Sequence, residues 1–260
     1  GQFFNADVVL RNALTNQELG RQALTNGKAT FNVAADINSV IAEVQGDADA
    51  QYFDEATSSK QDFGTGNRLR AAISLTNTTT NASITSLTEA AVKYAETLAG
   101  GLSKTANISA ANQKIAQIFG VTNVTQPVIV IGSPQDYLAL LNSTDTNAKN
   151  YALRLAALAQ SARDNLNTTQ QPALKMAKAL AADLSDGALN ARQMGDAYQA
   201  EELANSLKTS LAAIVTAIST NAAQTGFSTT QVNQLTSLIN TLSSQITINH
   251  AISHQCDTGM

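Results

Sequence analysis

The sequence predicts an α+β protein: a small antiparallel β-sandwich over 1–75, then an α-helical bundle domain over 84–252 and a tail over 253–260. Short β-branched runs separated by turn residues dominate the first part. After the polar run 76–81 the apolar period changes from two residues to 3.6, as in amphipathic helices. The 260 residues are 43% hydrophobic, which is enough apolar material for a packed core.

The predicted strands follow short runs of β-branched or alternating apolar residues, with Gly and Asn in the turns. Asn26-Gly27 supplies the two positive φ angles of a type I′ turn, so a hairpin is expected there. The predicted strands are Asp7–Arg11, Ala29–Val33, Val40–Val44 and Arg68–Ile73. Several short strands at a spacing of about ten residues favour a small sandwich.

The predicted helices follow from caps and apolar stripes. Ser86 should accept the Glu89 amide in a capping box that opens the first helix, and glycines at 100 and 101 should end it. Ser133-Pro134 is typical of the start of a short helix. The other predicted helices are 106–120, Asn147–Leu166, Gln170–Leu184, Gly195–Thr220 and Ser228–Ile252. Near-heptad stripes on the last two predict an antiparallel helical hairpin at the end of the bundle.

Charge and hydropathy exclude several classes of protein. With 16 basic and 20 acidic residues the net charge is −4, so no basic field favours nucleic acid. The longest apolar runs, such as Val128–Ile131, are far shorter than the roughly 18 residues of a membrane helix. Gly1–Phe4 lacks the features of a signal peptide, as expected for a mature exported chain, although a trimmed chain would look the same.

The densest carboxylate group is Asp47, Asp49, Asp54 and Glu55. Carboxylate oxygens at alternate positions of a bent loop can ligate Ca²⁺, but this segment lacks the central Gly and the further ligands of a calcium loop. A solvated acidic loop is therefore the first interpretation, and a calcium site is the alternative. Paired carboxylates for glycoside hydrolysis are disfavoured because Trp is absent and other aromatic residues are few.

Three residues near the end could form a second constellation. His250 and His254 are the only histidines and lie four residues apart, and Cys256 is the only cysteine. Together they could bind a metal if a helix continued there, but helices fray at chain ends, so a tail without a site is preferred. Cys256 is expected to be a free thiol, with a cross-chain disulfide as the alternative. Since a Ser-His-Asp site would have to use this tail, we predict no enzyme, no catalytic residue, no cofactor and no metal.

Scattered pieces over roughly residues 4–187 resemble known bacterial proteins. The strand region resembles a carboxypeptidase-regulatory-like or immunoglobulin-like sandwich of bacterial surface proteins. The helical region is similar to the segment that often follows such a domain in secreted proteins of Gram-negative bacteria. The pieces that carry the resemblance are Phe4–Val8, Thr25–Gly27, Val40–Gly46, Tyr52–Thr57, Leu69–Ala71, Ile84–Ala91, Leu102–Asn112, Tyr151–Ala159 and Leu180–Gly187. The resemblance implies an exported location and a binding or structural role, and it brings no catalytic residues.

These observations predict an extracellular structural or adhesive protein of the bacterial surface, either an adhesin-like subunit or a self-assembling, pilus-like filament protomer. Self-association is expected through strand addition, with Gln2–Arg11 as the exchanged or added strand. A surface protein or a glycan is the other expected partner; nucleic acid and a transmembrane segment are not expected. The alternative is a secreted module that binds a glycan, a peptide or Ca²⁺ through loops such as Asp47–Glu55.

Overall fold

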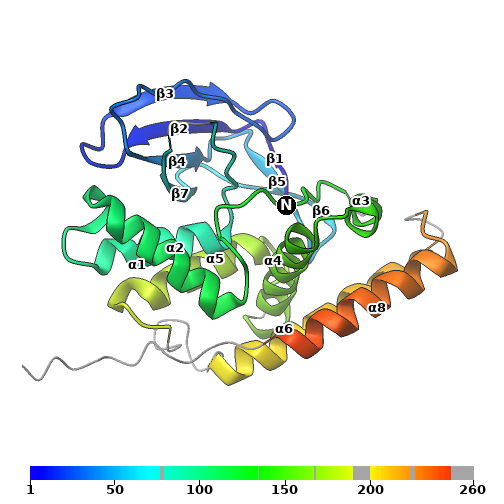
Figure 1. Cartoon of the computed structure of the whole chain (residues 1–260). Coiled ribbons are helices and arrows are strands. Elements are labelled where there is room, and N and C mark those ends of the chain that lie inside the picture. The colour runs from blue at the N-terminus through cyan, green and yellow to red at the C-terminus, as the bar shows by residue number, and fades with distance from the viewer. Residues whose placement is uncertain (77–78, 134, 167, 190–199, 223–225, 247–260) are drawn as a thin grey trace, which may run out of the picture.

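The chain is an α+β protein, with strands in the first part of the sequence and helices after them (Figure 1). The structure is a computed structural model. It describes residues 1–76, 79–133, 135–166, 168–189, 200–222 and 226–246. The predicted fold class is confirmed.

The strands form two antiparallel sheets. The larger has the order β3-β2-β4-β7 and the smaller the order β1-β5-β6. The strands are β1 (Phe3–Phe4), β2 (Asp7–Asn12), β3 (Glu18–Ala23), β4 (Ser39–Gln45), β5 (Gln51–Asp54), β6 (Ser59–Asp62) and β7 (Arg68–Ser74). Alternation along β4 and β7 gives the larger sheet two faces. One face shares a core with the smaller sheet, in which Val44 and Leu69 lie in the same cluster as Tyr52 and Phe63.

The predicted turn is confirmed, whereas the strand predicted after it is wrong. Asn26 has φ 51° and Gly27 has φ 72°, and a single bridge joins Thr25 to Lys28. Ala29–Val33 then runs outside any ladder. The apolar side chains of this segment pack on the sandwich core, but the Thr30 amide donates to the side chain of Gln22 instead of a backbone carbonyl. The alternation of apolar and polar residues in this segment therefore reflects side chains that pack against the core, and no partner strand pairs with its backbone.

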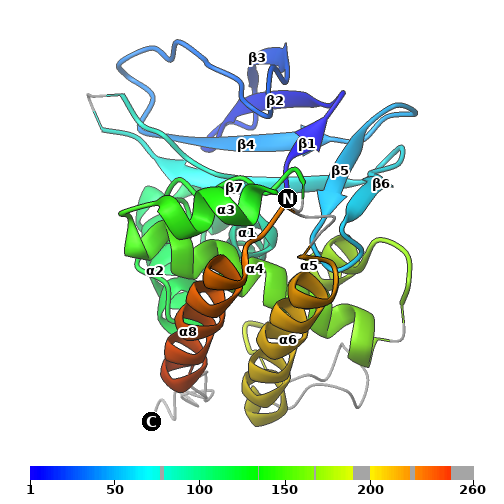
Figure 2. The same ribbon diagram turned by 90° about the vertical axis from the view of Figure 1, so that its right-hand side faces the viewer.

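The helices lie beneath the β7 side of the larger sheet (Figures 1 and 2). They are α1 (Ser86–Thr97), α2 (Thr105–Phe119), α3 (Asp136–Asn142), α4 (Thr146–Asn165), α5 (Pro172–Asp183), α6 (Ala200–Thr220) and α8 (Thr229–Gln245), with short 3₁₀ turns at Gly101–Ser103 and Leu184–Asp186. The outer parts of the two long predicted helices, 195–199 and 247–252, lie outside the described residues.

Two of the predicted helix starts need correction. The N-cap of α1 is Thr85, whose hydroxyl accepts the Thr88 amide in a capping box, so Ser86 and Glu89 do not form one. The N-cap of α3 is Gln135, while Ser133 donates its hydroxyl to Asp136 and position 134 lies outside the described residues. The cap of α1 thus lies one residue before the predicted cap, because Thr85 rather than Ser86 reaches the free amides of the first turn. The cap of α3 lies two residues after the predicted cap, and the side chain of Gln135 makes no capping hydrogen bond.

The end of α2 is held by a residue far along the chain. Gly120 closes this helix with φ 62°, as predicted. The buried Arg154 of α4 donates from Nε to the carbonyl of Phe119 at 2.7 Å. A cation at a helix C-terminus opposes the negative end of the helix dipole. Burial lowers the pKa of Arg154.

The helices form one large core, which the last two helices join. The stripes of α6 and α8 lie in the same cluster as the buried face of α4, including Leu211, Ile239 and Leu158. The two helices run antiparallel, which confirms the predicted hairpin (Figure 2). A smaller cluster joins Ile41 and Ala72 of the sheet to helices α1 and α2. No helix in the described part of the chain is long and apolar enough to cross a membrane.

Candidate functional site: an open sheet edge

The predicted acidic loop does not bring its carboxylates together. Asp54 is fully buried, and its carboxylate accepts the Tyr52 hydroxyl at 3.0 Å, the Ala56 amide at 3.0 Å and the Ala173 amide at 2.8 Å. Because Ala173 lies in the first turn of α5, Asp54 ties the smaller sheet to the positive end of that helix. Burial, followed by the charge of Asp54, raises the pKa of Tyr52.

Asp47 and Glu55 bind amide and amino groups close to them and share no common site. Asp47 accepts the amides of Asp49 and Ala50, both at 2.8 Å, and so shapes its own turn. Glu55 is buried and accepts from the amino group of Gly1 at 2.5 Å. These contacts account for the cluster as turn and core structure, and they leave the calcium interpretation without a common site.

The second constellation cannot be placed, since His250, His254 and Cys256 lie outside the described residues. Within the described ranges, no group of three or more His, Cys, Asp or Glu side chains is close enough to hold a metal ion.

The outer edge of β7 is closed by helix side chains. The backbone amide of Arg70 donates to Glu89 Oε2 of α1 at 2.7 Å. The carbonyl of Ala72 accepts from Asn112 Nδ2 of α2 at 3.0 Å. The Ser74 hydroxyl also lies 3.0 Å from that of Ser109 on α2. Backbone groups that another chain could pair with are therefore already occupied at this edge.

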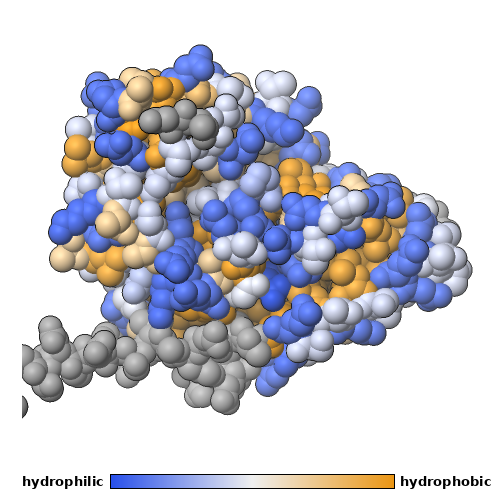
Figure 3. All heavy atoms as spheres, in the orientation of Figure 1, coloured by the Kyte–Doolittle hydropathy of each residue, from blue (hydrophilic) through white to orange (hydrophobic). Residues whose placement is uncertain are grey.

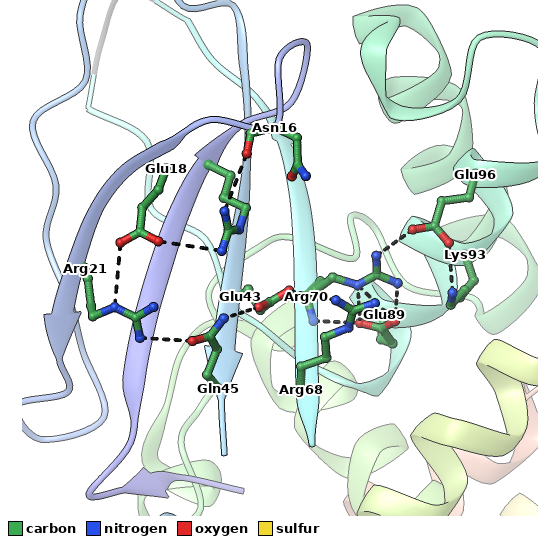
Figure 4. Close-up of polar contacts among 11 residues, drawn as sticks. Asn16, Glu18, Arg21, Glu43, Gln45, Arg68, Arg70, Glu89, Lys93 and Glu96 are labelled. Carbon is green, nitrogen blue, oxygen red and sulfur yellow. Dashed lines mark hydrogen bonds and ion pairs between the residues drawn. The ribbon is translucent and has the colours of Figure 1, made fainter. Parts of the chain in front are cut away.

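A buried ion network fixes the helix that closes this edge (Figure 4). Arg70 Nη2 donates to Glu89 Oε1 at 2.6 Å, and Arg70 Nη1 donates to Glu96 Oε1 at 2.5 Å. Lys93 also donates to Glu96, at 2.9 Å. Burial alone would raise the pKa of Glu96, but hydrogen bonds from Lys93 and Arg70 outweigh it and lower that pKa. Burial likewise opposes the charge of Arg70, yet its bonds to Glu89 raise its pKa overall.

The opposite edge of the larger sheet, β3, has no further described strand paired to it, although the segment after it touches it: the Phe31 ring lies beside Gly20 and the Thr30 amide donates to the side chain of Gln22. Among the described strands β3 pairs with β2 alone, and five of its six residues are exposed. Two large apolar residues are exposed to solvent here: Leu14 in the β2–β3 turn, with 67% of its surface exposed, and Leu19 on β3 itself, with 37%. Leu19 lies at a β-bulge, because Arg11 pairs with Glu18 while Leu10 pairs with Gly20. Figure 3 shows apolar and polar side chains side by side over this end of the molecule.

Charged side chains beside this edge pair with one another, and Figure 4 shows Glu18 and Arg21 among them. Arg11 lies 3.6 Å from Glu18, and Arg21 lies 3.6 Å from both Glu18 and Asp7. Arg21 also donates to Gln45 on β4 at 2.9 Å. The net charge of these two arginines and two carboxylates is zero, so two copies of this surface would repel each other little.

The segment predicted to be exchanged, Gln2–Arg11, divides into two parts. Residues 7–11 belong to β2, which pairs with β3 on one side and β4 on the other. That half is the middle of a sheet and offers no free edge. Residues 2–4 lie in or beside β1 at the margin of the smaller sheet. The openness of β3 escaped the sequence analysis, although the mix of Leu14 and Leu19 with charged neighbours was a visible signal.

Comparisons with known proteins found no matching family model, curated protein or solved structure.

Proposed function

We propose that this chain is an extracellular structural subunit of the bacterial surface that self-associates by adding a strand of another copy at β3. The observation that supports it best is the asymmetry of the larger sheet: side chains of α1 and α2 close the β7 edge, whereas β3 is exposed. Exposed edge strands are templates for pairing with another chain, and proteins that stay monomeric usually cover or blunt them.

The character of the β3 surface agrees with this proposal. Leu14 and Leu19 offer apolar contact, and the neutral set of charges around Arg21 offers pairing across an interface. A low overall charge, −4 over 260 residues, limits repulsion between copies. The resemblance to bacterial surface sandwiches supports the location, and it supplies the bacterial and exported parts of the proposal.

The mass of the purified protein in solution tests the proposal. Light scattering over a concentration series should show growth beyond 27.2 kDa, and electron micrographs should show rods or fibres. Leu14→Lys combined with Leu19→Lys adds charge to the edge and should reduce the mass toward that of a monomer. Ala110→Lys adds charge to an exposed position of α2 and serves as the control, with unchanged assembly expected. A wild-type protein that stays monomeric at its highest soluble concentration would refute self-association.

A further inference from the structure

The first residues of the chain lie in a slot between two segments that are distant in sequence. β1 is two residues long and pairs with β5, with Phe3 opposite Tyr52 and Phe4 opposite Gln51. On the side of β1 away from β5, the Gln2 amide donates to the carbonyl of Ile131 at 2.9 Å. The slot is thus bounded by β5 and by the extended segment Val128–Ile131.

Aromatic contacts anchor the strand in this slot. The ring of Phe3 lies 5.1 Å from that of Phe63 in an edge-on arrangement and 6.1 Å from that of Tyr52. Lys60 Nζ lies 4.1 Å from the centre of the Phe4 ring. These contacts are side-chain anchors in pockets, added to backbone bonds, and this combination is typical of strand addition between chains.

The strand does not fill its slot. A cavity of about 80 Å³ lies beside Phe3, lined by Tyr52, Phe63 and the whole of Val128–Ile131, with apolar residues of α4 and α5 behind them. Val130 in this lining is 44% exposed. Underpacking forfeits dispersion contacts, so the packing beside Phe3 is weaker than in a filled core. Polar contacts hold the residues before it instead: the Gly1 amino group donates to Glu55, and the Phe53 amide donates to the carbonyl of Gln2 at 2.8 Å.

The linker between β1 and β2 is short and strained. Asn5 has φ 50°, a left-handed conformation that costs Asn less than other non-glycine residues but more than Gly, and Ala6 beside it is buried. Straightening Asn5 would release that energy while β2 stays in its sheet. Short hinge loops under strain favour exchange of the element they hold between copies.

We propose that residues 1–4 are an exchangeable strand that, in the assembled protein, occupies the slot of a second copy. This inference rests on the self-association in the proposed function, and it adds a second link between copies, at β5 rather than at the β3 edge. The pairing with β5 and the aromatic contacts are the same in either arrangement, so protein concentration and the hinge decide between them. A reciprocal pair closes the assembly, and a one-way exchange extends it into a filament.

Cysteine cross-linking tests the exchange. Phe4→Cys with Gln51→Cys, in a Cys256→Ser background, places two thiols at paired positions of β1 and β5. Paired antiparallel residues have Cα atoms about 4.5–5.5 Å apart, which a disulfide can span. The matched control is Gln51→Cys with Asp62→Cys, a pair across the β5–β6 hairpin that stays within one chain.

The oligomeric fraction is isolated, oxidised and run on a non-reducing gel. We expect covalent dimers or a ladder from the β1–β5 pair and monomers from the control pair. Covalent monomers from both pairs would overturn the exchange while leaving strand addition at β3 intact. Absence of any oligomeric fraction would overturn both proposals.

A hinge variant gives an independent measure. Asn5→Gly accepts a positive φ without steric cost and should stabilise the closed form, so the cross-linked fraction should fall. An equal fraction in this variant would contradict the role given to the hinge.

Discussion

Replacing Glu89 by alanine should destabilise the protein more than any other single change in the sheet–helix contact. Its carboxylate accepts the backbone amide of Arg70 as well as the guanidinium, and the side chains of both residues are 7% exposed. Removal leaves a buried cation and a buried amide without this partner. Breaking a buried ion pair costs about 3–5 kcal/mol. We expect about 3 kcal/mol here, because Glu96 still accepts from Arg70.

The assay is urea unfolding followed by circular dichroism, since the chain has no Trp for fluorescence. A lower midpoint with an unchanged slope would report a loss of stability alone. Glu96→Ala is the comparison. Its carboxylate is 34% exposed, so its loss should cost about 1 kcal/mol or less.

A double-mutant cycle separates the pair from its surroundings. Arg70→Ala with Glu89→Ala removes both charges, so the double variant should be more stable than the sum of the two single losses predicts. If Glu89→Ala stays within about 1 kcal/mol of the wild type, the argument that this contact closes the β7 edge fails.

Three further predictions concern titration and backbone geometry. The folded pKa of Glu96 is lowered from 4.5, so the stability that its carboxylate contributes is present above the unfolded pKa and is lost as the pH falls through the folded pKa. The urea concentration at the unfolding midpoint should therefore fall once the pH is below about 4.5. The Glu96→Gln variant should lack that part of the fall. Arg154→Met keeps an apolar stem but leaves the Phe119 carbonyl without its donor, and it should cost about 1–3 kcal/mol in thermal unfolding, whereas an unchanged melting temperature would exclude the cap. Gly120→Ala combines φ 62° with a new Cβ 3.0 Å from Arg154 Nη2, so it should lower the melting temperature more than Gly66→Ala, where φ is 82° but no atom lies within 4 Å; equal effects would show that only the backbone matters.

Local patterns predicted most of the elements of this fold. Short β-branched or apolar runs identified β2, β4 and β7, and apolar stripes, some closed by a glycine, identified α2 and the helices after it. These signals depend on residues within one turn or one strand, which the sequence contains in full. Alternation failed at Ala29–Val33, because a segment can pack its side chains on a core without a pairing strand beside it.

The candidate site was predicted less well, because its roles depend on contacts between distant segments. Glu89 looked like a capping residue, yet it binds Arg70, nineteen positions earlier. Asp54 looked like one of a loop of ligands, yet it holds the first turn of α5, at Ala173. A carboxylate takes the strongest donor within reach, and only the folded chain decides which donor that is.

By itself, the sequence determined the α+β class, the order of strands before helices and the helical hairpin, since these follow from composition and short-range periodicity. Only the tertiary structure decided which strand edges are covered. Backbone groups of every strand are alike, so whether an edge is open depends on which distant side chains, such as Asn112 at β7, happen to reach it.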